Sequence, residues 1–156
     1  MNRVLQSMVC LTIKDSTYPT SIYVGKVLRP DTYNWLLISC KYILSEEFMS
    51  NHSDRIYGRS VCHYQKMSEP FIEKHMEQIW WPEVTRFQVL SEPFMEKYIR
   101  HLKWSYVSRY QKLSEPFMEK YADLLSWPDI IHGQKLSVEF RTKYSDQLGP
   151  LWGECI

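Results

Sequence analysis

The sequence predicts a mainly α-helical protein, an α-solenoid of about five helix-hairpin repeats that are each 23 residues long. Three observations support this fold class: a strict internal repeat, a helix-start signal in every copy, and a low glycine content of 5 residues in 156. The repeat is visible in strings related to LSEPF, which begin at Leu44, Met67, Leu90, Leu113 and Leu136. Five copies in phase without an insertion indicate that each copy is one unit of a stacked array.

The repeat divides the chain into three parts. Residues 35–148 carry the tandem repeats, residues 1–34 do not keep the phase, and residues 149–156 follow the last copy. We expect the first segment to be an N-terminal cap and the last to be a C-terminal cap tail, because terminal units of repeat arrays differ from internal ones. Gly149 and Pro150 should end the last helix.

The N-terminal cap contains a strand-like pattern. Apolar residues alternate at Val9, Leu11 and Ile13, a turn-prone segment follows, and Ile22 and Val24 continue the alternation. Alternation of this kind is typical of a half-buried strand. We therefore favour a small β-hairpin in this segment over a degenerate first repeat.

The second half of each repeat begins like a helix. A serine that can cap a helix N-terminus stands in every copy, at Ser45, Ser68, Ser91, Ser114 and Ser137. Glutamate follows the serine in four copies, and three of these add a proline, which suits the first turn of a helix. An apolar stripe then predicts a buried helix of about three turns, formed in the third copy by Phe94, Met95, Tyr98, Ile99 and Leu102.

The first half of each repeat predicts a shorter helix. Trp104, Val107 and Tyr110 are three residues apart, as on one face of a helix of about two turns. A glutamine ends this half in four copies, and we expect its side-chain amide to bond backbone groups across the helix junction. Helices this short are marginal alone, so neighbouring hairpins must stack to bury their apolar faces.

Composition and charge exclude several classes of protein. Lys and Arg total 19 against 18 Asp and Glu, and the formal charge of +1 gives no net field for capturing nucleic acid or an anionic membrane. The most apolar stretch is too short to span a membrane, and the N-terminus is a poor secretory signal. The four cysteines lack metal-binding spacing, which favours reduced thiols in a cytosol and no metal site.

Sequence patterns of catalysis are absent as well. The sequence has no phosphate-binding loop, dinucleotide fingerprint, zinc-protease motif or nucleophile elbow. The repeated serines are explained as helix caps and the repeated glutamates as surface elements, so neither set points to a pocket with a paired nucleophile and base. We predict that the protein is not an enzyme and needs no cofactor.

The repeat unit, W-x-x-V-S-x-Y-Q-K-L-S-E-P-F-M-E-K-Y-x-D-x-L, resembles the short tandem repeats of W-x-x-I-S-x-Y-Q-x-L-S-E-x-F type in proteins of large DNA viruses and phages. The resemblance covers residues 35–148. It implies a viral origin and a repeat scaffold, and it assigns no catalytic residues. Two departures from the pattern, Gly58 in place of tryptophan and Lys41 in place of tyrosine, predict looser packing at the first junction.

Charged columns in the repeat allow two interpretations. Arg86 and Arg109 share one column, and glutamates precede three of the four members of a lysine ladder. The ladder consists of Lys74, Lys97, Lys120 and Lys143. Mixed rows of charge usually belong to a solvated helix face. We favour that interpretation over a stripe that binds a polyanion or a protein.

We expect the chain to bind a protein partner through variable positions of the first helices, because repeat helices form a rigid platform and Tyr and Arg dominate interface energetics. The expected contact residues are Glu83, Arg86, Tyr106, Arg109, Asp129 and His132. With the resemblance, this predicts a viral modulator of a host factor, located in the host cytoplasm or the virion. The alternatives are a structural virion component, such as a minor capsid, cement or linker protein, and, ranked third, a nucleic-acid binder.

Overall fold

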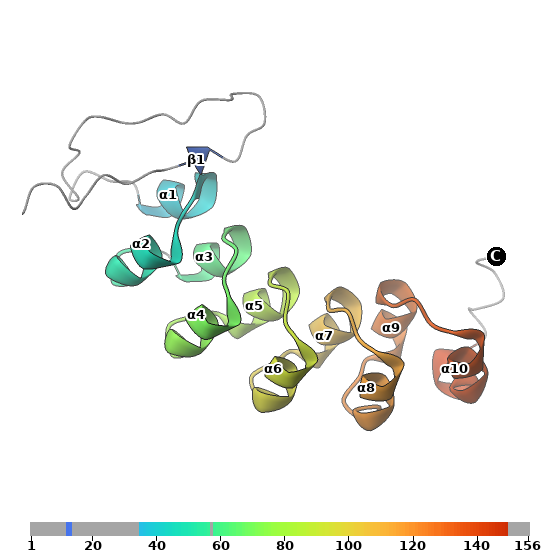
Figure 1. Ribbon diagram of the computed structural model, residues 1–156. Coiled ribbons are helices and arrows are strands. Elements are labelled where there is room, and N and C mark those ends of the chain that lie inside the picture. Colours follow the sequence, from blue (N-terminus) through green and yellow to red (C-terminus); the bar gives the residue numbers. More distant parts are fainter. Residues whose placement is uncertain (1–11, 14–34, 57, 150–156) are drawn as a thin grey trace, which may run out of the picture. The chain divides into compact units, whose positions relative to one another are not determined.

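The computed structural model describes residues 12–13, 35–56 and 58–149. In these residues the protein is mainly helical, and its helices pack in a repeated register (Figure 1). The chain divides into two compact units, Met1–Trp80 and Trp81–Ile156. Repeats 1 to 5 begin at positions 35, 58, 81, 104 and 127, so repeats 1 and 2 belong to the first unit and repeats 3 to 5 to the second.

The first helix of each repeat begins at the tryptophan position. These helices are α1 (Trp35–Lys41), α3 (Gly58–Tyr64), α5 (Trp81–Phe87), α7 (Trp104–Tyr110) and α9 (Trp127–Gly133). Each has seven residues, which confirms the predicted length of about two turns. In the first unit α1 packs on α3, and in the second unit α5 packs on α7 and α7 on α9.

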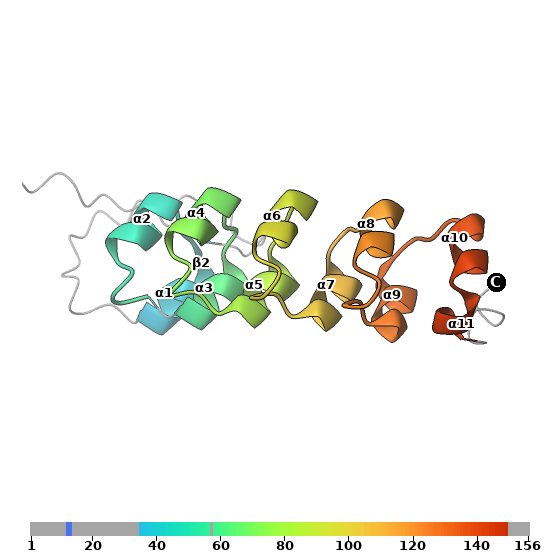
Figure 2. The ribbon, with the colours of Figure 1, turned by 90° about the horizontal axis from the view of Figure 1, so that it is seen from below.

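The second helix of each repeat begins after the predicted serine cap. These helices are α2 (Glu46–Asn51), α4 (Glu69–Lys74), α6 (Glu92–Lys97), α8 (Glu115–Lys120) and α10 (Val138–Lys143). In all five, the serine hydroxyl accepts a hydrogen bond of 3.0 to 3.3 Å from the N–H of the phenylalanine three residues later. The predicted helix starts are confirmed. Within each unit the second helices form a row beside the first helices (Figure 2).

The second helices are shorter than the apolar stripe predicts. Helix α6 has six residues, and Tyr98 leaves helical geometry with a φ of −110° and a ψ of 28°. A turn follows, in which the N–H of His101 donates to the carbonyl of Tyr98 at 2.9 Å. Leu102 beyond this turn is buried. The predicted length was therefore wrong, because a tight turn keeps the apolar residues on the buried side after the helix has ended.

The N-terminal strand has a partner outside the predicted cap. Strand β1 (Thr12–Ile13) pairs antiparallel with β2 (Tyr42–Ile43), which joins α1 to α2. Thr12 lies opposite Ile43, and Ile13 opposite Tyr42. The strand predicted at Ile13 is confirmed. Its described partner, however, belongs to the first repeat. The extended link between α1 and α2 offers an unpaired backbone edge with which the strand can pair. The rest of the expected hairpin lies outside the described residues.

The last described helix ends as predicted. Helix α11 (Ser145–Leu148) takes the place of the turn that follows the second helix in other repeats. It stops at Gly149, whose φ of +70° is a conformation that residues with a side chain rarely adopt. Pro150 and the remaining tail lie outside the described residues.

Aromatic stacks fill the junctions between helices. The ring centroid of Trp104 lies 6.4 Å from that of Phe117 and 5.6 Å from that of Tyr121. In the next repeat Trp127 lies 5.0 Å from Tyr144. Such pairs add stability beyond the apolar area that they bury. The tryptophan and the aromatic residue at the end of the second helix therefore form one packing unit in each of the four repeats that contain the tryptophan.

Glutamines of the repeated column bond the backbone of the preceding repeat, as predicted, and three of the four, Gln65, Gln88 and Gln111, are buried. The Nε2 atom of Gln111 donates to the carbonyls of Thr85 at 2.7 Å and Gln88 at 2.8 Å. Its Oε1 atom accepts from the N–H of Leu90 at 3.0 Å. The corresponding glutamines of repeats 2 and 5 make the same three bonds. One side chain thus satisfies three backbone groups where two repeats meet.

The glutamates that follow the cap serines also join repeats, a role that the sequence did not predict for these surface residues. The carboxylate of Glu92 accepts from the N–H of Ser114 at 2.6 Å and from its hydroxyl at 3.1 Å. Glu115 bonds Ser137 in the same way, at 2.6 and 3.0 Å. Each of these serines therefore caps its own helix and donates to the preceding repeat. The link spans 22 residues, which a search for pairs within one helix does not reveal.

Candidate functional site

The predicted contact residues lie on three packed helices of the second unit. They form two columns, because the same two positions recur on α5, α7 and α9. We call this surface the ridge; it consists of Glu83, Arg86, Tyr106, Arg109, Asp129 and His132. Its two arginines and its histidine are exposed, and its other three members are half-buried. The ridge is thus accessible along the whole row of first helices in this unit.

Arg86 lies against a cluster of aromatic rings. Its guanidinium carbon is 5.8 Å from the ring centroid of Tyr106, 5.1 Å from that of Tyr110 and 4.9 Å from that of Phe87. The two tyrosine rings pack edge to face with centroids 5.8 Å apart. A guanidinium within about 6 Å of an aromatic ring gains cation–π attraction. These contacts orient exposed side chains before any partner binds.

An ion pair joins the next two helices of the ridge. Atom Nη1 of Arg109 on α7 lies 3.6 Å from Oδ1 of Asp129 on α9. Exposed pairs of this kind add little stability, so its main effect is to orient the guanidinium. His132 donates from Nδ1 to the carbonyl of Pro128 on its own helix at 2.7 Å. The structure therefore brings together Arg86 with Tyr106 and Arg109 with Asp129.

A glycine allows α9 to lie close to α7. A Cβ atom added to Gly133 would overlap the backbone of Arg109. The position of Gly133 is occupied by Tyr64, Phe87 and Tyr110 in the preceding repeats. The sequence analysis gave this glycine no role, although the change from three successive aromatic residues to glycine was visible.

Two aromatic residues lie on the surface, although Tyr110 was expected on one helix face with Trp104 and Val107. Phe87 is 37% exposed and Tyr110 is 43% exposed, although both belong to the aromatic column that precedes the glutamine. Lys103 was also missed; its Nζ atom lies 4.3 Å from the ring centroid of Tyr106. The sequence signal for the exposure of Phe87 and Tyr110 was their position: each ends its first helix and directly precedes a glutamine that is buried.

Two members of the lysine ladder of the second helices are paired with carboxylates. The Nζ atom of Lys120 lies 2.8 Å from Oε1 of Glu96, and that of Lys143 lies 2.8 Å from Oε1 of Glu119. The hydrogen bond raises the pKa of Lys120 and lowers the pKa of Glu96, and the corresponding bond to Glu119 raises the pKa of Lys143. All four side chains are exposed. The predicted mixed, solvated face is confirmed for these two pairs.

Across the residues that the structure describes, no helix is long and apolar enough to cross a membrane. Within the same residues, no three His, Cys, Asp or Glu side chains are grouped so that they could hold a metal ion. The resemblance to viral tandem repeats stays a prediction. Comparison with known protein families, curated proteins and solved structures finds no match for this chain.

Proposed function

We propose that the chain is a repeat scaffold, an α-solenoid of about five 23-residue helix hairpins, that binds a protein partner through the ridge. The observation that carries this proposal is the cluster in which exposed Arg86 lies against Phe87, Tyr106 and Tyr110. Arg and Tyr are enriched among the residues that dominate binding energy in protein interfaces. Side chains that are already oriented also lose less conformational freedom on binding.

The architecture supports a binding role. Helices pack in a repeated register inside each unit, and buried glutamines join successive repeats. Stacked hairpins hold the side chains of successive first helices at fixed spacing, as repeat proteins do at their extended binding surfaces. In the second unit this places the Arg86 cluster beside the pair of Arg109 and Asp129, so a partner can meet both.

The charge pattern disfavours nucleic acid as the partner. A stripe that follows a phosphate backbone requires cations that are not neutralised by neighbouring carboxylates. Here Lys120 and Lys143 each bond a glutamate, and Arg109 pairs with Asp129. The aromatic rings around Arg86 instead offer apolar area to a folded protein. That the partner is a host factor, met in the cytoplasm of an infected cell, is proposed from the resemblance alone.

The test compares two double variants of the tagged full-length chain. Arg86→Ala with Tyr110→Ala removes the centre of the cluster, whereas Lys120→Ala with Lys143→Ala removes two exposed cations from the second helices. Proteins captured from infected cells are quantified by mass spectrometry, after far-UV circular dichroism has shown that both variants are folded. We expect a specific protein that the ridge variant loses and the ladder variant retains.

Three outcomes would contradict the proposal. Equal loss of the captured protein in both variants would show that the ridge is not the contact surface. Capture that disappears after nuclease treatment would indicate nucleic acid. Enrichment of the chain in purified particles together with capsid proteins would make it a structural component of the virion.

A further inference from the structure

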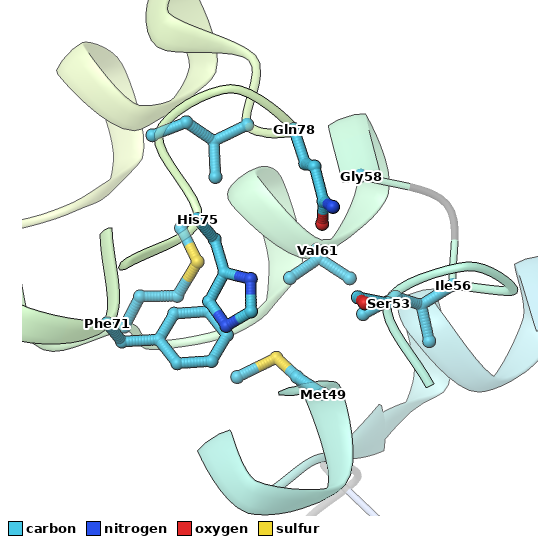
Figure 3. A pocket seen from close by; sticks show the side chains of 10 residues that line it. Met49, Ser53, Ile56, Gly58, Val61, Phe71, His75 and Gln78 are labelled. Atoms are coloured by element: carbon cyan, nitrogen blue, oxygen red, sulfur yellow. The ribbon is translucent and has the colours of Figure 1, made fainter. Parts of the chain in front are cut away.

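The second repeat contains a pocket where the other four repeats have tryptophan. Gly58 occupies that position at the start of α3. The pocket has a volume of about 130 Å³, and Met49, Val61, Phe71 and His75 surround it (Figure 3). It lies wholly within the first unit. It is therefore separate from the ridge.

The pocket is the counterpart of a filled core in the fifth repeat. That core surrounds Trp127 with six buried residues: Met118, Leu125, Ile130, Leu136, Phe140 and Leu148. The six residues at the same positions three repeats earlier all line the pocket. The walls that hold an indole ring are thus present in the first unit, and the ring is missing.

The loss of tryptophan leaves this space, because Gly58 stands where the other four repeats have that residue. Relative to the fifth repeat, Val61 in place of Ile130 and His75 in place of Tyr144 also reduce side-chain volume, but the same residue types occur in repeats that keep tryptophan. Met49, Val61 and Phe71 are buried and still line the space, which shows that the walls have not collapsed inward. Gln78, which also lines the pocket, is exposed, and His75 and Ser53 are half-buried, so the pocket is open to the surface.

The pocket also has the counterpart of a hydrogen-bond acceptor for an indole nitrogen. In the fourth repeat, Nε1 of Trp104 donates to the carbonyl of Ile99 at 3.1 Å. Two repeats earlier the residue at the Ile99 position is Ser53, which lines the pocket. A ring placed as Trp104 is placed would direct its N–H toward the carbonyl of Ser53.

We propose that this pocket binds an indole ring from outside the chain. The size is suitable, since apolar protein cavities of about 150 Å³ remain dry and bind a benzene ring, and this pocket also opens to the surface. The chemistry is suitable because the walls are those that pack an indole elsewhere in the same chain. The source of the ring is either a free small aromatic molecule or a tryptophan side chain.

Indole itself is the first probe, titrated into the full-length protein while methyl resonances are followed by NMR. Saturable shifts are expected for Met49, Val61 and Ile79. Their counterparts in the filled core, Ile130 and Leu148, serve as the internal control and should not move. Absence of shifts up to the solubility limit, or equal shifts at both sites, would overturn the proposal.

Two variants fill the pocket from within. Gly58→Trp restores the residue of the other repeats, although a Cβ there would lie 2.9 Å from the carbonyl oxygen of Gln78. Val61→Phe therefore serves as a second variant, which fills the space from another position of α3. Loss of the saturable shifts in a folded variant supports the proposal, and unchanged binding in both contradicts it. If neither variant folds, the methyl mapping on the natural chain still decides.

Two further probes define the ligand. Indene has the shape of indole without the N–H, and we expect it to bind more weakly if the carbonyl of Ser53 accepts a hydrogen bond. N-acetyl-tryptophanamide distinguishes the sources: shifts of the same methyl groups would point to a tryptophan side chain, and binding of indole alone to a free small molecule. The Arg86→Ala with Tyr110→Ala variant should bind indole normally, so failure of the ridge proposal and failure of this one are distinguishable.

Discussion

Gln111 and Lys120 both join neighbouring repeats, and they differ in burial. Gln111 is 4% exposed and bonds three backbone groups of the preceding repeat. Lys120 bonds Glu96 of the preceding repeat once, and the two side chains are 59% and 39% exposed. Both contacts recur with the same 23-residue period. The period marks a position as part of the repeat, but burial decides how much stability depends on it.

The physical reason is what remains when the side chain is removed. Without the amide of Gln111, two carbonyls and one N–H stay in a place that water reaches poorly, and each unsatisfied buried group is costly. Without Lys120, the carboxylate of Glu96 is hydrated.

Removal of a buried ring gives the upper end of the scale. Phe94 is 4% exposed and packs against Tyr98 at a centroid distance of 4.7 Å. Phe94→Ala should lower the free energy of unfolding by about 3–5 kcal/mol, because it leaves a cavity. Urea denaturation followed by far-UV circular dichroism measures the loss. Equally small effects of Phe94→Ala and Glu96→Ala would contradict the packing of helix pairs described above.

Removal of the buried amide should cost nearly as much. Gln111→Ala is expected to lower the free energy of unfolding by about 2–4 kcal/mol, since it leaves three backbone groups without their partner. Gln134→Ala is the matched comparison; Gln134 makes the same bonds but is only half-buried, so its loss should cost less. The same urea series compares the two variants. An effect of Gln111→Ala no greater than that of Lys120→Ala would break the contrast.

A helix cap should give an intermediate effect. Ser114→Ala removes the hydroxyl that accepts from the N–H of Phe117 and donates to Glu92, and a loss of about 1 kcal/mol is expected. Ser145→Ala is the control, because no side chain caps α11. Thermal unfolding of both variants measures the difference, and equal melting temperatures would contradict a capping role for Ser114.

The exposed pair should give the smallest effect, and its contribution depends on pH. The pKa of Glu96 is lowered by Lys120, so the pair contributes above the ordinary glutamate pKa and is lost as pH falls through the lowered value. The pKa of Lys120 is raised, so the same contribution disappears again as pH rises through the raised value. The difference in melting temperature between the natural chain and Lys120→Ala should therefore be small near neutrality and vanish at both extremes. A difference that grows in acid would contradict this assignment.

Local signals in the sequence predicted the helix starts well. Serine followed by an acidic residue and proline is a combination that acts within a single turn, so Ser91 could be read without knowledge of the fold. The end of α6 was not predictable in the same way, because no glycine marks it and the apolar stripe continues through the turn to Leu102. Periodicity indicates which residues lie on the buried side. A tight turn can keep the following residues on the same side, so periodicity alone does not show where the helix ends.

Contacts between repeats were predictable where one polar residue type recurred, because a position exposed to solvent would be expected to vary. The Gln column, which holds glutamine in four of the five repeats, met this condition, and its bonding was predicted. The link from Glu92 to Ser114 was not, because each residue already had a local explanation at a helix start. For the ridge, columns 23 residues apart placed Arg86 near Tyr106, but the exposure of Tyr110 depends on how the first helices pack.

Because each glutamine reaches backward along the chain, a repeat cannot complete its buried hydrogen bonds during synthesis until the next repeat has been made. The carbonyl of Thr85 waits for Gln111, 26 residues later, which corresponds to about 1–5 s of translation at ordinary rates. The growing end of the nascent chain therefore always carries one unfinished hairpin. Until the following first helix emerges, the open backbone groups of that hairpin bond water instead of the glutamine amide.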